Sequence, residues 1–217
     1  FMGENGLPPS AFSVGGRFGY VDDATTPNTQ LLVMSYEKAP LYFEVRGLPS
    51  STDSKEMDAY RGSSIGVVFQ FEKGHLLIPS YTAAIAFDER GEVVKRWGNH
   101  TLPGEAPAPQ EKAAASKVSE HHANFIAAVR SRDAASLACN AREGELSSAL
   151  CHLAGISHRL GTPLHPDAAK ERIKADRYAA ETLGRLLEHL KLNQALPEQI
   201  TLGATLKVDT KAETIID

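Results

Sequence analysis

Residues 121–161 read HHANFIAAVRSRDAASLACNAREGELSSALCHLAGISHRLG. Apolar side chains recur at helical spacing on both sides of a short polar segment, so this stretch predicts two amphipathic helices joined by a loop. The expected buried stripe of the first helix comprises Val118, His122, Phe125, Ile126 and Val129. The expected stripe of the second helix comprises Leu146, Leu150, Leu153, Ser157 and Leu160.

Shorter signals mark the ends and faces of these helices. Ser116 or Ser119 is available to cap the first helix, and Gly161 is expected to end the second as a C-cap. Pro166 and Asp167 suit the first turn of a third helix, which is predicted to run to Leu192. A face of small side chains on the second helix, suited to close packing, comprises Ser147, Cys151, Ala154 and Gly155.

The part of the chain that precedes these helices predicts strands rich in β-branched and aromatic residues. The candidate strands are residues 11–18, 29–36, 41–46, 64–71, 75–79, 83–87 and 92–97. Gly74 and Gly91 sit where a tight reversal needs a positive φ, so the last four strands predict a meander. Residues 19–28 and 47–62 form two long polar excursions of the kind that often carries function.

Strands followed by helices, without an alternating βαβ order, indicate an α+β fold. We expect one large, open, mostly antiparallel sheet with helices packed on one face, in a single domain of residues 1–217. Residues 1–97 are expected to be mainly strands, 98–115 a linker rich in Gly and Pro, and 116–217 mainly helices with a short terminal strand. The other face of the sheet is expected to pair with a second copy, because a large apolar face is unfavourable in water.

The composition is that of a globular protein, with 42% hydrophobic and 23% charged residues. The formal net charge of -4 provides no basic field for nucleic acid, and no apolar run approaches the ~20 residues of a membrane span. We therefore expect neither nucleic acid nor a membrane as a partner. The two cysteines, Cys139 and Cys151, are too few for a disulfide framework and are interpreted as reduced core or surface thiols, which slightly favours the cytoplasm.

The chain begins Phe1-Met2-Gly3, which we interpret as an excerpt from a longer polypeptide. Because any targeting segment of that polypeptide would lie upstream of Phe1, export of the parent protein stays an alternative.

Two motifs suggest a cofactor or a metal and are interpreted otherwise. The glycine cluster of residues 15–19 ends a strand with no helix after it, and a dinucleotide needs a helix N-terminus, so the chain alone is not expected to hold NAD. Among the eight histidines, neither His121 with His122 nor His152 with His158 has the i, i+4 spacing of a helical metal pair. We predict that His122 is a hydrogen-bonded core residue and that His121 and His152 serve packing or an interface.

Neither nucleophilic nor paired-carboxylate chemistry is expected. No strained nucleophile elbow is expected in the chain, and Cys151 lies among small and apolar residues of a helix, so it is predicted to be inert. Asp22 and Asp23 are adjacent residues of a polar excursion, which is typical of a solvated acidic turn.

Segments over nearly the whole chain resemble the C-terminal domain of one bacterial branch of the Gfo/Idh/MocA oxidoreductases. The segments, in order, are SVGGRFGYVDDATTPNTQ (13–30), YFEVRGLP (42–49), YRGSSIGVVFQFEKG (60–74), FDERGEVVKRW (87–97), NFIAAVRSRD (124–133), SSALCHLAGISHRLG (147–161) and LGATLKVD (202–209). The third helix and its Leu-rich end depart from the family pattern.

The resemblance implies a substrate-binding and dimerisation domain of an NAD(P)-dependent enzyme that acts on a sugar, an inositol or a similar polyol. In the family, the nicotinamide cofactor (NAD or NADP) and an acid-base lysine belong to an N-terminal Rossmann domain, and an Asp and a His lie on a helix that would precede Gly6. The main catalytic residues are therefore expected upstream of Phe1, and the chain alone is expected to be inactive.

The resemblance also implies a set of substrate-binding residues. By the register of related sugar dehydrogenases these are Tyr60, Arg61 and Ser63, and we add Arg46 and Tyr20 beside the two long excursions. An arginine fork binds a hydroxyl pair or a carboxylate, and a tyrosine offers a stacking surface. The alternative is that these residues form the solvated flank of a loop.

Two other functions stay open. One is a non-catalytic dimerisation or ligand-binding module that kept the fold and lost the chemistry. The other is a fragment of an NAD-dependent glycosidase of the same fold, which cleaves a glycosidic bond through transient oxidation.

Overall fold

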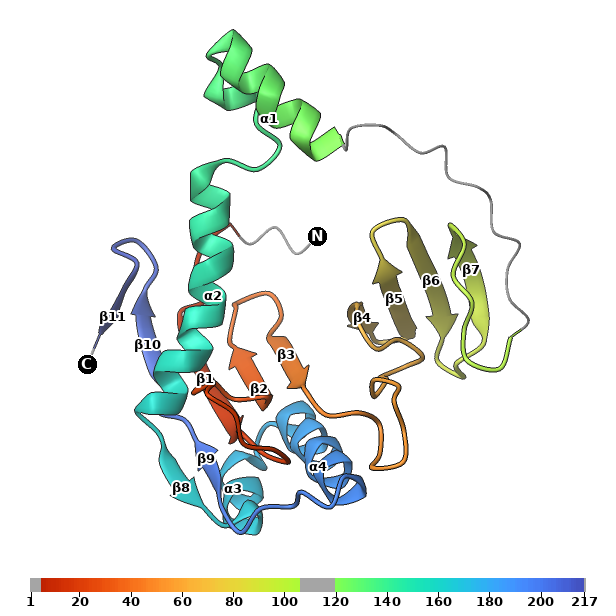
Figure 1. Ribbon diagram of the computed structural model, residues 1–217, viewed down its shortest axis with the longest axis vertical. Coiled ribbons are helices and arrows are strands. Elements are labelled where there is room, and N and C mark those ends of the chain that lie inside the picture. Colours follow the sequence, from red (N-terminus) through yellow and green to blue (C-terminus); the bar gives the residue numbers. More distant parts are fainter. Residues whose placement is uncertain (1–4, 106–119, 217) are drawn as a thin grey trace. The chain divides into compact units, whose positions relative to one another are not determined.

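The computed structural model describes residues 5–105 and 120–216 (Figure 1). They fall into two compact units, one from residues 1–53 with 117–217 and the other from residues 54–116. Antiparallel sheets and four α-helices in these ranges agree with the predicted α+β class. That the two units act as one domain stays a prediction. No helix in the described ranges is long and apolar enough to cross a membrane.

The larger unit contains a seven-stranded sheet in which every paired strand is antiparallel. Its strands are β1 (Ser10–Gly16), β2 (Thr29–Met34), β3 (Leu41–Arg46), β8 (Thr162–Leu164), β9 (Ile200–Leu202), β10 (Leu206–Asp209) and β11 (Thr214–Ile216). The order is β11-β10-β1-β2-β3, and β9 pairs with both β1 and β8. The prediction of one short terminal strand is wrong, because three strands follow the last helix and β8 lies between helices.

All helices in the described ranges belong to this larger unit. They are α1 (Glu120–Ser131), the short 3-10 helix η1 (Ala134–Ser136), α2 (Ala141–Arg159), α3 (Pro166–Ile173) and α4 (Arg177–Leu192). The single third helix predicted from Pro166 to Leu192 is wrong. Asp176 adopts an extended backbone, and its side chain accepts a hydrogen bond from the backbone N of Ala179 at 3.0 Å, so it starts a new helix.

Helices cover both faces of the seven-stranded sheet. Leu31 and Val33 of β2 belong to the core formed with α3 and α4, while Leu32 and Met34 belong to the core formed with α2 (Figure 1). Every residue of β2 is buried. Because neighbouring side chains of a strand point to opposite faces, burial of all of them requires cover on both sides. The expectation that helices pack on one face only is therefore wrong for this sheet.

Helix α2 confirms most of its predicted stripe. Leu153 and Ser157 are buried and Leu146 and Leu150 are partly buried, whereas Leu160 is 63% exposed. Of the small face, Ala154 is buried and Cys151 is exposed. Both thiols are therefore surface thiols, since Cys139 and Cys151 are free and exposed.

The prediction that Gly161 is the C-cap of α2 is wrong, and the glycine is needed for another reason. Leu160 occupies the C-cap position of α2. A Cβ at Gly161 would lie 2.5 Å from the carbonyl oxygen of Leu202 in β9. The glycine is needed because β9 passes so close to the end of the helix.

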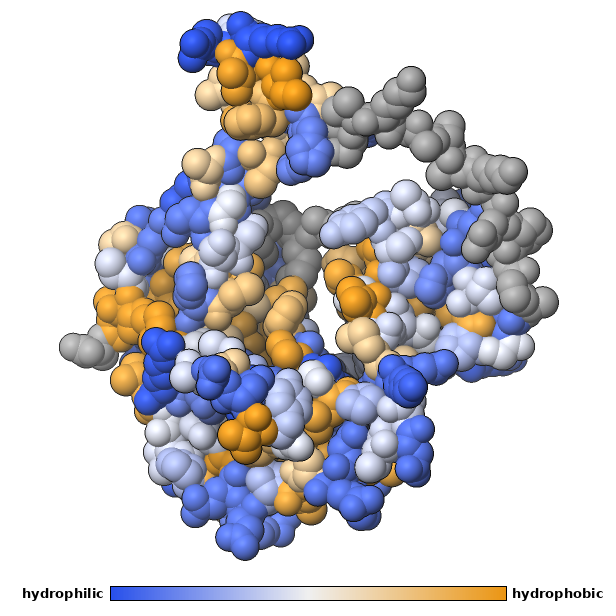
Figure 2. Space-filling model, viewed as in Figure 1, coloured by the Kyte–Doolittle hydropathy of each residue, from blue (hydrophilic) through white to orange (hydrophobic). Residues whose placement is uncertain are grey.

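Helix α1 contradicts its predicted buried stripe. Phe125 is 61% exposed, and Ile126 and Val129 are exposed as well. Apolar side chains gather on this helix in Figure 2. His122 is exposed rather than a core residue, and Val118, Ser116 and Ser119 lie outside the described residues. Periodicity located the apolar side of the helix, but it cannot say what covers that side.

The smaller unit is built on the predicted meander. Its antiparallel strands follow the order β4 (Val67–Phe71), β5 (Gly74–Ser80), β6 (Ala83–Asp88) and β7 (Val93–Trp97). One face carries His75, Leu77 and Ile85, which are buried. Residues 98–105, predicted as the start of a linker, bond to this unit: Arg96 forms an ion pair with Glu105 and donates to the carbonyl of His100 at 3.3 Å. Residues 106–115 lie outside the described residues.

The opposite face of this sheet carries mainly apolar side chains, none of which is fully buried. Pairing register places on it Val67, Phe69, Phe71, Leu76, Ile78, Ala84, Ala86, Lys95 and Trp97. We call this set the apolar sheet face. The ammonium of Lys95 lies 4.7 Å from the centre of the Trp97 ring, and both Phe71 and Trp97 are close to half exposed.

Candidate functional site

Tyr60, Arg61 and Ser63, the predicted substrate residues, share one tight turn of the smaller unit. The backbone N of Tyr60 donates to the carbonyl of Ser63 at 2.9 Å, and the reverse bond is 3.1 Å. Arg61 and Gly62 between them have φ values of 51° and 85°. A left-handed backbone costs a non-glycine residue about 1–2 kcal/mol, so the turn holds Arg61 in a strained conformation.

The guanidinium of Arg61 is held by neutral groups. Its Nε donates to the Tyr60 hydroxyl at 3.3 Å, one Nη lies 3.2 Å from Nδ1 of His75, and the other donates to Oε1 of Gln70 at 3.2 Å. Burial lowers the pKa of His75, and the Arg61 charge lowers it further. His75 is also stacked on Phe87, with ring centres 4.4 Å apart. A neutral His75 accepts from Arg61, and the arginine is thereby anchored to the sheet.

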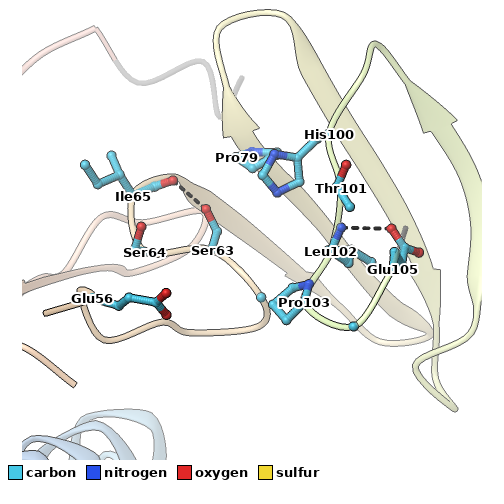
Figure 3. A pocket seen from close by; sticks show the side chains of 12 residues that line it. Glu56, Ser63, Ser64, Ile65, Pro79, His100, Thr101, Leu102, Pro103 and Glu105 are labelled. Carbon is cyan, nitrogen blue, oxygen red and sulfur yellow. Dashed lines mark hydrogen bonds between the residues drawn. The ribbon is translucent and has the colours of Figure 1, made fainter. Parts of the chain in front are cut away.

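The three predicted residues do not line one common hollow. Ser63 lines a pocket of about 530 Å³, which we call the Ser63 pocket (Figure 3). Its lining residues are Glu56, Gly62, Ser63, Ser64, Ile65, Pro79, His100, Thr101, Leu102, Pro103, Gly104 and Glu105. Arg61 instead lines a smaller hollow of about 160 Å³ with Gln70, His75 and three acidic residues. Tyr60 lines neither of the two.

The Ser63 pocket combines apolar surface with hydroxyl and carboxylate groups. Ile65, Pro79, Leu102 and Pro103 contribute the apolar part. The hydroxyl of Ser63 is used internally, since it donates to the carbonyl of Ile65 at 2.5 Å (Figure 3).

Glu105 is also used internally. It accepts from the backbone N of Leu102 at 2.8 Å and pairs with Arg96, and these two contacts hold the pKa of its carboxyl below the usual range. Its charge is thereby partly compensated.

Three polar side chains of the Ser63 pocket are not fully used by contacts within the protein. Within the described part of the chain, Glu56 forms no ion pair and Ser64 forms no side-chain hydrogen bond. The Nε2 atom of His100 is buried and has no hydrogen-bond partner there. A buried polar atom without a partner costs about 1–3 kcal/mol, so a ligand hydroxyl or a water that reaches this ring would be stabilising.

Sequence reasoning missed Glu56, His100 and Thr101 as lining residues. Glu56 stands in a polar excursion that was expected to carry function, and this was the available signal. His100 and Thr101 stand in the stretch interpreted as a linker, because its Gly and Pro residues resemble those of a flexible connection.

Arg46 and Tyr20 belong to the larger unit. Arg46 lies on β3 and pairs with Glu44 at 2.6 Å, and Arg185 of α4 pairs with the other carboxylate oxygen at 2.7 Å. Tyr20 is 47% exposed, and the Arg17 guanidinium lies 5.1 Å from the centre of its ring. These contacts tie both residues to their own unit.

The glycine cluster of residues 15–19 does not fit a dinucleotide. Strand β1 ends at Gly16, and the chain passes through a loop directly into β2. The Asn28 side chain accepts from the backbone N of Phe18 and donates to its carbonyl, so it closes this loop. The loop therefore has no helix N-terminus for a pyrophosphate. Among the described residues, no group of three or more His, Cys, Asp or Glu side chains is arranged to hold a metal ion.

The chain was also compared with known proteins. No protein-family model, curated protein or solved structure matches it.

Proposed function

We propose that the chain is the substrate-binding and dimerisation domain of an NAD(P)-dependent oxidoreductase that acts on a sugar, an inositol or a similar polyol. The specific fold belongs to the same proposal, namely the C-terminal domain of a Gfo/Idh/MocA protein. The nicotinamide cofactor would be held by a Rossmann domain elsewhere in the parent polypeptide, because the described glycine loop does not fit a dinucleotide.

The Ser63 pocket is the observation that supports this proposal most strongly. Its prolines and its leucine offer surface to the C–H face of a ring, and Ser64, Thr101 and Glu56 offer polar groups at its edge. Pockets that combine apolar surface with a few placed polar groups are typical of small-molecule sites. The predicted residue Ser63 lies in its wall.

The apolar sheet face supports the dimerisation part of the proposal. A sheet face with Phe71 and Trp97 close to half exposed is typical of an interaction surface. A second copy of the chain would bury the same face on both sides, which is the usual symmetry of a homodimer.

The test of the enzymatic proposal begins with the reading frame upstream of Phe1. We expect a Gly-x-Gly-x-x-Gly after a strand, followed by a Glu-Lys-Pro. The longer polypeptide should then reduce NAD or NADP with a polyol, while residues 1–217 alone stay inactive.

Product analysis with free polyols and glycosides separates this activity from the glycosidase alternative, which releases sugar without net reduction. A stop codon directly upstream of Phe1 would favour a non-catalytic module instead.

A further inference from the structure

The Ser63 pocket has an uneven balance of charge. Among the described residues, no lysine or arginine lines it, whereas Glu56 and Glu105 do. Arg96 compensates Glu105 through an ion pair, but no cation pairs with Glu56 within the described residues. A ligand in this pocket therefore meets one uncompensated carboxylate.

We propose that the Ser63 pocket binds an uncharged polyhydroxylated ligand through Glu56 and His100 and discriminates against sugar acids. This inference rests on the proposed function and narrows its substrate class. It also places recognition on two residues outside the set predicted by the resemblance.

Glu56 suits a vicinal diol. An ionised carboxylate accepts hydrogen bonds at two oxygens, so it satisfies two neighbouring hydroxyl groups at once. His100 has a buried Nε2 atom without a partner among the described residues, and its ring lies beside Thr101 in the wall of the pocket (Figure 3). Once the ring turns toward the pocket, a ligand hydroxyl, directly or through a water, supplies the missing hydrogen bond.

A ligand that carries a carboxylate would be repelled by Glu56. Its carboxylate would lie near Glu56, and no described residue of the wall has a cationic side chain. Arg61, the residue that would suit a carboxylate, lines the other hollow, and its guanidinium is held by Tyr60, Gln70 and His75. Like charges a few ångströms apart in a wet pocket reduce affinity by roughly tenfold.

The test compares D-glucose with D-glucuronate, which differ by one carboxylate. Calorimetric titration of the 217-residue chain should give a dissociation constant for glucuronate roughly tenfold above that for glucose. Glucose should also shift the imidazole signals of His100 in NMR spectra. The variant Glu56→Gln should bind glucose more weakly, and its ratio of the two constants should fall toward one.

Glu72→Gln is the matched control, since Glu72 lines only the other hollow and is exposed. It should leave both constants within about twofold.

Three results would overturn the inference. They are tighter binding of glucuronate than of glucose, an unchanged ratio in Glu56→Gln, and glucose-induced shifts confined to Arg61 and its neighbours. In each of these cases sugar still binds, so the proposed function stands. Absence of binding by both sugars and by free inositol would overturn both proposals.

Discussion

Ser157 of α2 supplies a hydrogen bond that the sheet does not supply to Ser13 of β1. Strand β1 pairs with β10 at residues 10–11 and with β9 at residues 14–15, which leaves Ser13 between the two partners. The backbone N of Ser13 donates to Oγ of Ser157 at 2.9 Å, and this hydroxyl donates to the carbonyl of Ala204 at 2.8 Å. Both serines are fully buried, so this polar contact between the helix and the sheet is shielded from solvent.

Ser157→Ala should lower the free energy of unfolding by about 1–3 kcal/mol, because it leaves a buried N–H group without a partner. Ser147→Ala is the matched control, since Ser147 lies on the same helix, is exposed, and bonds only to the carbonyl of Glu143. It should change stability by less than about 0.5 kcal/mol. Urea unfolding followed by far-ultraviolet circular dichroism measures both, and equal losses in the two variants would contradict the buried contact.

Tyr42 gives the larger unit a dependence on alkaline pH. Its hydroxyl donates to both carboxylate oxygens of Asp176 at 3.0 Å. Burial raises the pKa of Tyr42 far above its ordinary value of 10.0, and Asp176 raises it further. A folded pKa above the unfolded value gives stability that is complete below the unfolded pKa and is lost as pH rises above it.

We therefore expect unfolding midpoints in urea to fall above a pH of about 10 in the native chain. At neutral pH the free energy of unfolding of Tyr42→Phe should be about 1.5–3 kcal/mol below that of the native chain, because the variant loses a hydrogen bond to a charged group, and its midpoint should fall less steeply with pH. Parallel pH profiles for the two proteins would show that Tyr42 does not carry the dependence.

Sequence pattern places residues within local elements, but it does not show which distant neighbours a side chain meets. Tyr60, Arg61 and Ser63, which come from the resemblance, share one turn, and their role in binding substrate stays a prediction. The direction of the Arg61 side chain was not predictable, since it depends on Gln70 and His75 of the following strands. His100 was missed for the same reason, because its pocket partners lie in residues 56–65.

At the scale of elements, the strands were predictable and the helix ends less so. The seven predicted strands correspond to β1–β7, because alternation and glycine turns are local signals. Asp176 is a good N-cap, but it stands within a continuous helical pattern, so the break between α3 and α4 was missed. The burial of α1 could not be predicted, because helical periodicity shows which side of the helix is apolar but not which element covers that side.

The two glycines near the end of α2 should respond in opposite ways to alanine. A Cβ at Gly161 would meet the Leu202 carbonyl at 2.5 Å, whereas at Gly155 a Cβ would meet no atom within 4 Å beyond its chain neighbours and the backbone of its own helix. Gly161→Ala should destabilise the larger unit by about 1–3 kcal/mol, and Gly155→Ala should stabilise it by about 0.5–1 kcal/mol. Thermal unfolding of the two variants measures the difference. Stabilisation by Gly161→Ala would contradict the close approach of β9.

At the scale of the whole molecule, sequence order suggested a strand half followed by a helical half. The structure instead groups β1, β2 and β3 with the helices and leaves β4–β7 as a separate unit. Pairing of β1 with β9 and β10 joins segments from opposite ends of the chain, and no local signal specifies such pairing. The run LLVM in β2 was a signal of cover on both faces, since a one-sided strand alternates.

The proposed dimer predicts a change at the single tryptophan of the chain. Trp97 lies on the apolar sheet face, so its fluorescence should shift to longer wavelength on dilution as the dimer separates and water reaches the ring. Phe71→Lys should weaken the dimer at least tenfold, because it places a charge in an apolar interface.

Tyr81→Lys is the control for the dimer. Tyr81 is also aromatic and is fully exposed, and it lies in the turn between β5 and β6 rather than on the face. Sedimentation should give the same dimer for this variant as for the native chain. A native chain that sediments as a monomer at high concentration would contradict the dimer.

The central claim, that the smaller unit carries a polyol site, is tested most directly by one NMR titration. The 217-residue chain, labelled with ¹⁵N, is titrated with myo-inositol and its amide shifts are followed. The account predicts saturable shifts concentrated in residues 56–65 and 100–105, the two segments that line the Ser63 pocket together with Pro79. A spectrum that stays unchanged at saturating polyol, or shifts confined to the larger unit, would contradict it.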